Sequence, residues 1–133
     1  MRFLLMIFAV VWWGNSAAAQ DRDAVEGVIG QQLQAFNDRD VAGAWVFAGP
    51  NIQRMFGNAT NFGAMVQQGY PMVWDNSNVQ FLEFRGESGI AVQRVLIEDA
   101  QGLRHVLDYM MVETPTGWRI AGVSLVPAPD VGA

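Results

Sequence analysis

Residues 90–126 decide the fold of this chain. They read IAVQRVLIE (90–98), DAQG (99–102), LRHVLDYMMVET (103–114), PT (115–116) and GWRIAGVSLV (117–126). The long runs are rich in β-branched and apolar residues, whereas glycine recurs in the short connections, where a turn needs a positive φ. A similar run near 78–85 precedes them, and the turn at Gly86–Gly89 separates the two. Because short turns join antiparallel neighbours, the sequence predicts a four-stranded antiparallel meander with strands near 78–85, 90–98, 103–114 and 118–126.

Turn chemistry also predicts how the strands align. A type I turn with a glycine bulge at Gly102 pairs Asp99 with Leu103, and we expect the same device at Gly117. Three pairs of opposite charge then face each other: Glu98 with Arg104, Arg94 with Asp108, and Glu113 with Arg119. A wrong register would place like charges together as often, so these pairs favour the predicted alignment.

This register sorts the strand side chains onto two faces. One face carries Gln80, Leu82, Phe84, Ala91, Gln93, Val95, Ile97, His105, Leu107, Tyr109, Met111, Ala121, Val123 and Leu125. The other carries Val79, Phe81, Ile90, Val92, Leu96, Val106, Met110, Val112, Trp118 and Ile120, with Glu83, Arg94, Asp108 and Ser124 among them. The first face has only uncharged polar groups at its centre, so we assign it to the helices. The second is charged yet apolar enough for a partner surface, and the reverse assignment stays open.

The first half of the chain has helical periodicity. Apolar residues recur at three- and four-residue steps over 24–36, and Asp23 with Glu26 forms a helix start. Asp40 is suited to cap a second, short helix that carries Trp45. Together with the meander, these segments predict an α+β domain with N-terminal helices packed on a curved four-stranded sheet.

Further helical turns are expected before the strands begin. Residues 51–56 look like one or two turns after the Gly49-Pro50 break. Thr60 or Asn61 then opens a third helix, which Gly69–Pro71 ends. The side chains of this helix that we expect to face inward are Phe62, Met65 and Val66.

The N-terminus has the three parts of a secretory signal peptide. Arg2 precedes an apolar run over 3–13, and a small-residue close follows at Ala17–Ala19. The run is shorter than the roughly 20 residues that span a bilayer. We therefore expect cleavage after Ala19, a single domain over 20–126, a flexible tail over 127–133, and a periplasmic or secreted location without a membrane anchor. An uncleaved anchor is the alternative.

Composition limits the chemistry. The 133 residues contain no cysteine, which excludes a thiol nucleophile, an iron–sulfur cluster and a thiolate zinc site. The chain has thirteen acidic and eight basic residues, which give a formal charge of −5, so nucleic acid is not expected as a partner. One histidine and no clustered acidic loop argue against a metal site, and no nucleotide fingerprint indicates a cofactor.

The order of the motifs resembles a known superfamily. Ile29-x-x-x-Leu33-x-Ala35-Phe36, Asp40-x-x-x-Ala44-Trp45 and the closing Gly117-Trp118-Arg119-Ile120 are similar to the NTF2-like (cystatin-like) superfamily. The run Phe62-x-x-Met65-Val66-x-x-Gly69-Tyr70-Pro71 after Asn51-Ile52 resembles the uncharacterised bacterial DUF4864 proteins within it. The resemblance implies helices against a cone-shaped sheet around a pocket. It implies no particular function, because that fold hosts enzymes and inert binding modules alike. No residues here match the Asp/Tyr or His/Asp sets of its enzymes, so the resemblance assigns no catalytic residue.

The candidate pocket residues lie at the centre and rim of the helix-facing side. Gln93 and Tyr109 pair across two strands, where they either hydrogen-bond each other or orient a ligand. His105 is the one histidine, and it cannot form a dyad with Asp108, which points to the opposite face. The side chains that we expect to close the pocket mouth are Trp45, Tyr70 and Trp74.

Three functions remain open from the sequence. The first is a non-enzymatic module that binds a small apolar ligand. The second is an isomerase or dehydratase that uses Tyr109, His105 or an acid, and it requires a carboxylate or imidazole in the pocket. The third is a structural or interaction protein that forms a homodimer through the outer sheet face. The side chains of that interface would be Val92, Val106, Met110, Val112 and Ile120.

Overall fold

The structure of the protein is a computed structural model that describes residues 17–127. The expected signal peptide lies outside the described residues over 1–16, and the expected tail over 128–133. Within 17–127 the elements follow in the order α1 (Ala17–Asn37), α2 (Val41–Trp45), α3 (Pro50–Phe56), α4 (Ala59–Gly69), α5 (Pro71–Trp74), β1 (Asn78–Glu87), β2 (Ile90–Glu98), β3 (Arg104–Thr114) and β4 (Gly117–Val126). The α+β class and the meander are confirmed.

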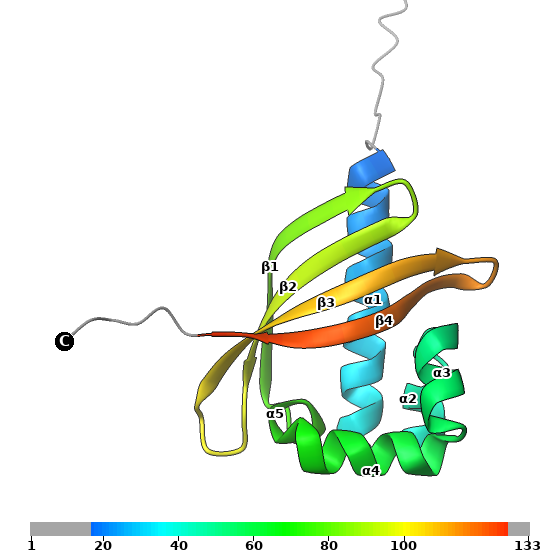
Figure 1. Cartoon of the computed structure of the whole chain (residues 1–133). Helices are drawn as coiled ribbons and strands as arrows, with labels where there is room; N and C mark the ends of the chain where they lie inside the picture. Colours follow the sequence, from blue (N-terminus) through cyan, green and yellow to red (C-terminus); the bar gives the residue numbers. More distant parts are fainter. Residues whose placement is uncertain (1–16, 128–133) are drawn as a thin grey trace, which may run out of the picture.

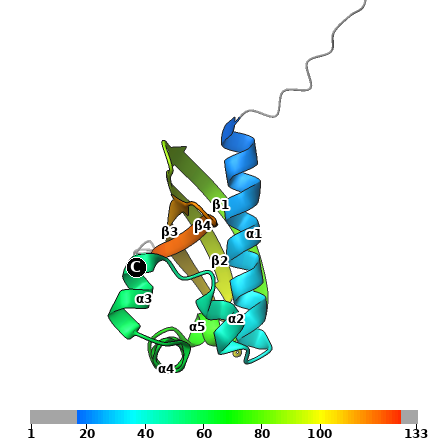
Figure 2. The same cartoon turned by 90° about the vertical axis from the view of Figure 1, so that its right-hand side faces the viewer.

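The strands form one antiparallel sheet in the order β1-β2-β3-β4. The sheet is open and curved, and α1 crosses one of its faces (Figure 1). The other helices gather near the C-terminal end of α1, where α3 and α4 form a second layer beside β4 (Figure 2). One face of the sheet is thus covered by helices, whereas the other has no element on it in the described part of the chain.

The core lies between α1 and the centre of the sheet. Val25, Ile29, Leu33 and Phe36 recur at three- and four-residue steps along α1, so one face of that helix is buried. The strand side chains that meet it alternate along β2 and β3, and all are buried: Ala91, Gln93, Val95, Ile97, Leu107, Tyr109 and Met111. The predicted helix-facing side of these two central strands is confirmed.

The helix boundaries differ from the predicted ones at three places. Helix α1 already begins at Ala17, so Asp23 does not start it, although Val25 is its first buried residue. The N-cap of α4 is Asn58, whose Oδ1 accepts from the backbone N–H of Asn61 at 2.8 Å; the expected caps Thr60 and Asn61 lie inside the helix. The single turn α5, which starts with Pro71, was not predicted. The Asp40 cap of α2 is confirmed, since Oδ1 accepts from Gly43 N–H at 2.9 Å.

The β2–β3 hairpin has the predicted register. Asp99 N–H donates to the Leu103 carbonyl at 2.9 Å, and Gly102 has a φ of +80°. Two of the predicted charge pairs follow: Glu98 lies opposite Arg104, and Arg94 lies opposite Asp108. Local turn chemistry is sufficient here because glycine adopts this φ without strain.

The β3–β4 hairpin departs from the prediction by one residue. Thr114 pairs with Gly117 across a two-residue turn, so Arg119 lies opposite Val112 and the predicted Glu113–Arg119 pair is wrong. A shift of one residue turns every side chain to the other face. Trp118 and Ile120, expected on the outer face, are therefore buried with exposed fractions of 6% and 2%. A bulge at Ala121 then restores the register, and Val123 lies opposite Tyr109 as expected.

Strand β1 contains a second bulge. Phe81 pairs with Val95, but Phe84 pairs with Gln93, so Leu82 and Glu83 together oppose one residue of β2. The bulge reverses the predicted faces at the start of the strand, because an inserted residue shifts the alternation. The side chains that pack on the core are Val79, Phe81 and Phe84. The expected inward positions of Gln80 and Leu82 are wrong, and that of Phe84 is right.

Candidate functional site

A partly open cavity lies between the helical layer and the edge of the sheet. Its volume is about 250 Å³. The residues that line it come from α1, the α2–α3 connection, α3, α4, α5, β3 and β4: Gln32, Phe36, Ala48, Asn51, Ile52, Met55, Phe56, Phe62, Met65, Val66, Tyr70, Val73, Tyr109, Ile120, Ala121, Gly122 and Val123. Hydrocarbon and aromatic groups dominate this lining. We refer to it as the α3–α4 cavity.

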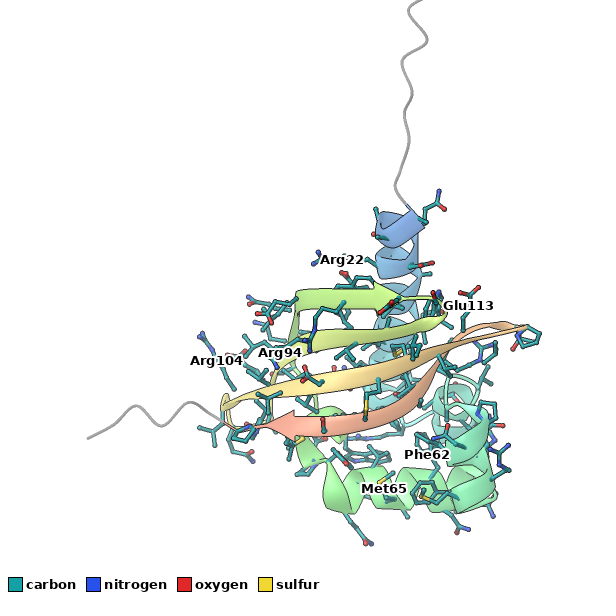
Figure 3. All side chains as sticks on the ribbon, turned by 45° about the horizontal axis from the view of Figure 1, so that its top comes forward. Arg22, Phe62, Met65, Arg94, Arg104 and Glu113 are labelled. Carbon is teal, nitrogen blue, oxygen red and sulfur yellow. The ribbon has the colours of Figure 1, made fainter. Side chains whose placement is uncertain are left out.

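Helix α4 forms one wall. Phe62, Met65 and Val66 stand three and four residues apart, so they share one helix face, as the sequence predicted. Figure 3 labels Phe62 and Met65 on the helical layer beside β4. The ring of Phe62 lies near two aromatic rings that also line the cavity, with centroids 5.9 Å from Phe36 and 6.1 Å from Phe56. These contacts fix an aromatic wall on one side of the cavity.

The edge of β4 forms the opposite wall. The chain before α3 pairs with this edge, since Gly49 N–H donates to the Ile120 carbonyl at 2.7 Å and Ile120 N–H to the Phe47 carbonyl at 2.8 Å. Farther along, Asn51 Nδ2 donates to the Ala121 carbonyl at 2.8 Å. The Tyr70 hydroxyl donates to the Val123 carbonyl at 3.3 Å. Backbone and side-chain donors thus hold the helical layer against the sheet on either side of the opening.

Tyr109 supplies the floor. It stands at the centre of β3 with no exposed surface, and its hydroxyl oxygen has no hydrogen-bond partner. Burial raises the pKa of this phenol, with a smaller contribution from nearby Tyr70, so the group stays protonated and neutral over the physiological range. A buried hydroxyl without a partner is unusual, because nearly all buried polar groups in proteins are satisfied. The hydroxyl is therefore the most distinctive polar group of the cavity.

Gln93 has a different role from the predicted one. It lies opposite Tyr109 in the ladder, but it does not line the cavity, and the mutual hydrogen bond is absent. Its Nε2 lies 3.2 and 3.3 Å from the carbonyls of Leu82 and Glu83, the two bulge residues of β1, and 2.9 Å from that of Arg94. The buried amide thus donates to the carbonyls of both bulge residues, and Arg22 Nη2 also donates to that of Leu82 at 3.2 Å. The amide oxygen of Gln93, Oε1, is buried without a hydrogen-bond partner.

His105 lies away from the cavity, near the β2–β3 turn. Its Nε2 is 2.8 Å from Asp99 Oδ2, while Asp99 Oδ1 accepts from the N–H groups of Gln101 and Leu103. The hydrogen bond to His105 is the main cause that lowers the pKa of the Asp99 carboxyl, and the two backbone donors act in the same direction. The structure places this histidine in a turn cap, not in the predicted pocket.

The two tryptophans do not close the cavity either. Trp74 packs 6.0 Å from Phe36, and the guanidinium of Arg39 lies 4.4 Å from its ring centre. Trp45 packs 5.6 Å from Phe62 and lines a second, more open groove beside the β3–β4 turn. Of the six predicted site residues, only Tyr109 and Tyr70 line the α3–α4 cavity.

Sequence reasoning missed Gln32 among the lining residues. It is buried on the apolar face of α1, and its Nε2 donates to the Ala44 carbonyl at 3.1 Å. Its position four residues before Phe36 on that face is a signal, because an amide within an apolar stripe needs a buried partner. Ile52, Met55 and Phe56 gave no comparable signal, since their place depends on how α3 docks.

The electrostatics of the lining restrict its chemistry. Tyr70 and Tyr109 are its titratable groups, and no carboxylate, imidazole, ammonium or guanidinium belongs to it among residues 17–127. Nowhere in that range do three histidine, aspartate or glutamate side chains gather as metal ligands would. No helix in the same range is both long and apolar enough to cross a bilayer. The arrangement can hold a small molecule by apolar contact and orient it by the Tyr109 hydroxyl.

Comparison with known proteins identifies one family. The model of a domain of unknown function, DUF4864, matches residues 18–133, which include every helix and strand described above except the first residue of α1. No curated protein matches the chain. The residues that resemble this family in the sequence include six that line the cavity, namely Asn51, Ile52, Phe62, Met65, Val66 and Tyr70. The match spans most of the chain, and the protein therefore belongs to the DUF4864 family.

Proposed function

We propose that the protein is an exported, non-enzymatic binding domain that holds a small, mostly apolar molecule in the α3–α4 cavity. One observation carries the proposal: a 250 Å³ space lined by hydrocarbon and aromatic groups adjoins a fully buried hydroxyl that lacks a partner. Small-molecule sites have this composition, with an apolar wall and a few polar groups that fix orientation. An apolar cavity of about 150 Å³ already accepts benzene, so a one-ring compound with a substituent fits here.

We favour binding over catalysis because of the side chains that line the α3–α4 cavity. An isomerase or dehydratase needs a general base or acid within reach of the ligand. The carboxylates and the imidazole of residues 17–127 lie outside the cavity lining, and His105 is engaged with Asp99. The phenol of Tyr109 has a raised pKa, which makes it a poor base at neutral pH. Binding is the function that requires nothing beyond the groups present.

The fold supports the NTF2-like (cystatin-like) resemblance as part of the proposal. Helices lie against the covered face of a curved antiparallel meander, and the cavity opens where α3 and α4 meet the β4 edge. A pocket between helical layer and sheet is what that resemblance implies.

The proposed export follows from the N-terminal sequence and is compatible with the core. Residues 17–20 are exposed, and the first buried side chain of α1 is Val25. Cleavage after Ala19 would thus remove no core residue. Asp21 and Asp23 would then lie in the first turn of the shortened helix, where negative charge suits the helix dipole.

A ligand screen tests the binding proposal. Thermal unfolding and native mass spectrometry of the chain from Gln20 onward, with a panel of small apolar one-ring compounds, should give saturable stabilisation by at least one compound. Val123→Phe places a ring in the cavity and should abolish it, whereas Val46→Phe is the matched control, since Val46 is 54% exposed and lies outside the lining. Stabilisation that survives Val123→Phe, or none with any compound, would contradict the proposal.

The uncovered sheet face supports a second function, homodimer formation. This open face consists of outward side chains of β2 and β3 in cross-strand rows: Ile90 with Val112, Val92 with Met110, Arg94 with Asp108, and Leu96 with Val106. Ile90 is 64% exposed and Met110 42% exposed. Ile120, expected here from the sequence, is excluded because it is buried.

A second copy of the chain fits this pattern. The charged row, in which Arg94 Nε donates to Asp108 Oδ1 at 2.9 Å, lies between apolar rows on both sides; Figure 3 shows Arg94 on this face. A two-fold axis through the charged row would set apolar rows against apolar rows and Arg94 beside the copy's acid. Sedimentation should show a dimer that Met110→Glu dissociates and Leu103→Glu, in the exposed turn, does not. A wild-type monomer at about 50 μM, well above the dissociation constants of stable dimers, would refute it.

A further inference from the structure

One side chain of the cavity lining has a buried polar group without a hydrogen-bond partner. Gln32 Nε2 donates to the Ala44 carbonyl, Asn51 Nδ2 to the Ala121 carbonyl, and the Tyr70 hydroxyl to the Val123 carbonyl. Among the lining side chains of residues 17–127, the Tyr109 hydroxyl alone is buried without a partner. This hydroxyl is therefore the unused polar group that a ligand in the cavity would have to reach.

The ligand group that meets this hydroxyl must accept a hydrogen bond. The raised pKa of Tyr109 keeps its proton in place, and a phenol donates that proton more strongly than it accepts another. A carbonyl oxygen is the matching acceptor, because it needs no proton of its own and is small enough to lie against a sheet floor.

The ligand must also be neutral. No charged side chain of residues 17–127 lines the cavity, so a carboxylate or an ammonium would lose its hydration without a counter-ion. The aromatic wall of Phe36, Phe56 and Phe62 tolerates a ring, and sulfur contacts from Met55 and Met65 favour one.

The geometry of the cavity also predicts how the ligand is oriented. Tyr109 has no exposed surface, whereas Met55 on the α3 side is 73% exposed. The acceptor atom thus lies deepest, and the hydrocarbon end lies toward the α3 side of the opening.

Resting on the proposed binding function, we infer that the cavity selects neutral ring compounds that carry a carbonyl oxygen, bound oxygen-first against Tyr109. Two probes of nearly the same shape distinguish selectivity for a carbonyl oxygen from apolar binding without that selectivity. Acetophenone carries a C=O group where 2-phenylpropene carries a C=CH₂ group, and both are somewhat larger than benzene. Benzoate and phenyltrimethylammonium serve as charged probes.

Isothermal titration with the chain from Gln20 onward should give an affinity for acetophenone about ten-fold above that for 2-phenylpropene, the value of one hydrogen bond. Both charged probes should bind more weakly than acetophenone. Tyr109→Phe should abolish the ten-fold preference while leaving the affinity for 2-phenylpropene unchanged. Val46→Phe is the control and should keep the preference, because Val46 is 54% exposed and lies outside the lining.

Infrared spectroscopy gives a second measurement that does not depend on a folded variant. The carbonyl stretch of acetophenone bound to the wild-type chain should lie below its frequency in hexane, as a hydrogen-bonded carbonyl does. An unshifted stretch, equal affinity for the two neutral probes, tighter binding of either charged probe, or a preference that survives Tyr109→Phe would overturn the inference and leave the binding proposal standing. Failure of both neutral probes to bind would overturn the inference, while other apolar compounds would still test the binding proposal.

Discussion

Tyr109 and Gln93 lie directly opposite each other on β3 and β2, yet their polar side chains do not hydrogen-bond each other. The amide of Gln93 donates to the carbonyls of the β1 bulge, whereas the Tyr109 hydroxyl lines the α3–α4 cavity without a partner. The side-chain donor of Gln93 thus has partners in the sheet, whereas the hydroxyl of Tyr109 has none. The first two predictions test this difference.

Replacement of Tyr109 by phenylalanine should not destabilise the ligand-free protein. The hydroxyl makes no hydrogen bond, so its removal leaves the packing of the ring intact and relieves a desolvated group. The free energy of unfolding in urea should stay within error or rise by about 1 kcal/mol. A loss of about 2 kcal/mol or more would show that the hydroxyl has a strong partner in solution.

Replacement of Gln93 by leucine should destabilise the fold. The variant keeps the volume of the side chain but removes the Gln93 donor from the carbonyls of Leu82 and Glu83, and only that of Leu82 keeps another side-chain donor, Arg22. We expect a loss of about 1–3 kcal/mol in the free energy of unfolding, measured by urea denaturation. Gln80→Leu is the matched control on β1, because Gln80 is exposed, and equal losses in the two variants would contradict the structural role of Gln93.

A methyl group at Gly63 should disturb the contact between α4 and α2. A Cβ at this position would lie 2.6 Å from Val41 Cγ1, closer than van der Waals contact allows. Gly63→Ala should cost about 1–3 kcal/mol despite the better helix propensity of alanine. In Gly30→Ala, where nothing lies within 4 Å, propensity should act alone and stabilise the protein by up to about 1 kcal/mol. Differential scanning calorimetry compares the two, and stabilisation by both would show that α2 and α4 do not approach this closely.

Stability at low pH should depend on the open-face ion pair. Hydrogen bonds from Arg94 lower the pKa of the Asp108 carboxyl below its ordinary value. As the pH falls below about 4, the unfolded chain takes up the proton first. The contribution of this pair is therefore present above that pH and is lost as the pH falls through the depressed folded-state pKa.

Urea denaturation of the wild type and of Asp108→Asn at several pH values measures this effect. The wild type should be the more stable protein at pH 6, and the difference should shrink steadily below about pH 4. Glu98→Gln is the control, because its partner Arg104 is 3.6 Å away and 70% exposed, so a small difference is expected there. A wild-type advantage that stays constant down to pH 2 would contradict the prediction.

The extent to which the sequence predicted the sheet differs from strand to strand. The β2–β3 register follows from Gly102 and the Asp99 cap, which act within five residues. The β3–β4 register does not, because Thr114 pairs with Gly117 in a two-residue turn that the sequence pattern did not distinguish from a glycine bulge. Trp118 consequently lies in the core, and not on the outer face.

The sequence also predicted the candidate site only in part. Tyr109 and Tyr70 were predicted and line the cavity, whereas His105 belongs to a turn cap and Trp45 and Trp74 pack against phenylalanine rings. Residue type identified aromatic and polar side chains near the centre of the domain. Which of them reach a common space depends on the docking of α3 and α4, and no local pattern encodes that.

By itself, the sequence determined the α+β class, the four-stranded meander, the inward face of β2 and β3 and the stripe of α1, because periodicity and turn residues act over a few positions. The tertiary structure alone decided the bulges in β1 and β4, the faces of the strand segments beside them, and the single hydroxyl left open in the cavity. One inserted residue exchanges the two faces of a strand at little local cost, so the choice is made by the helices that pack against it.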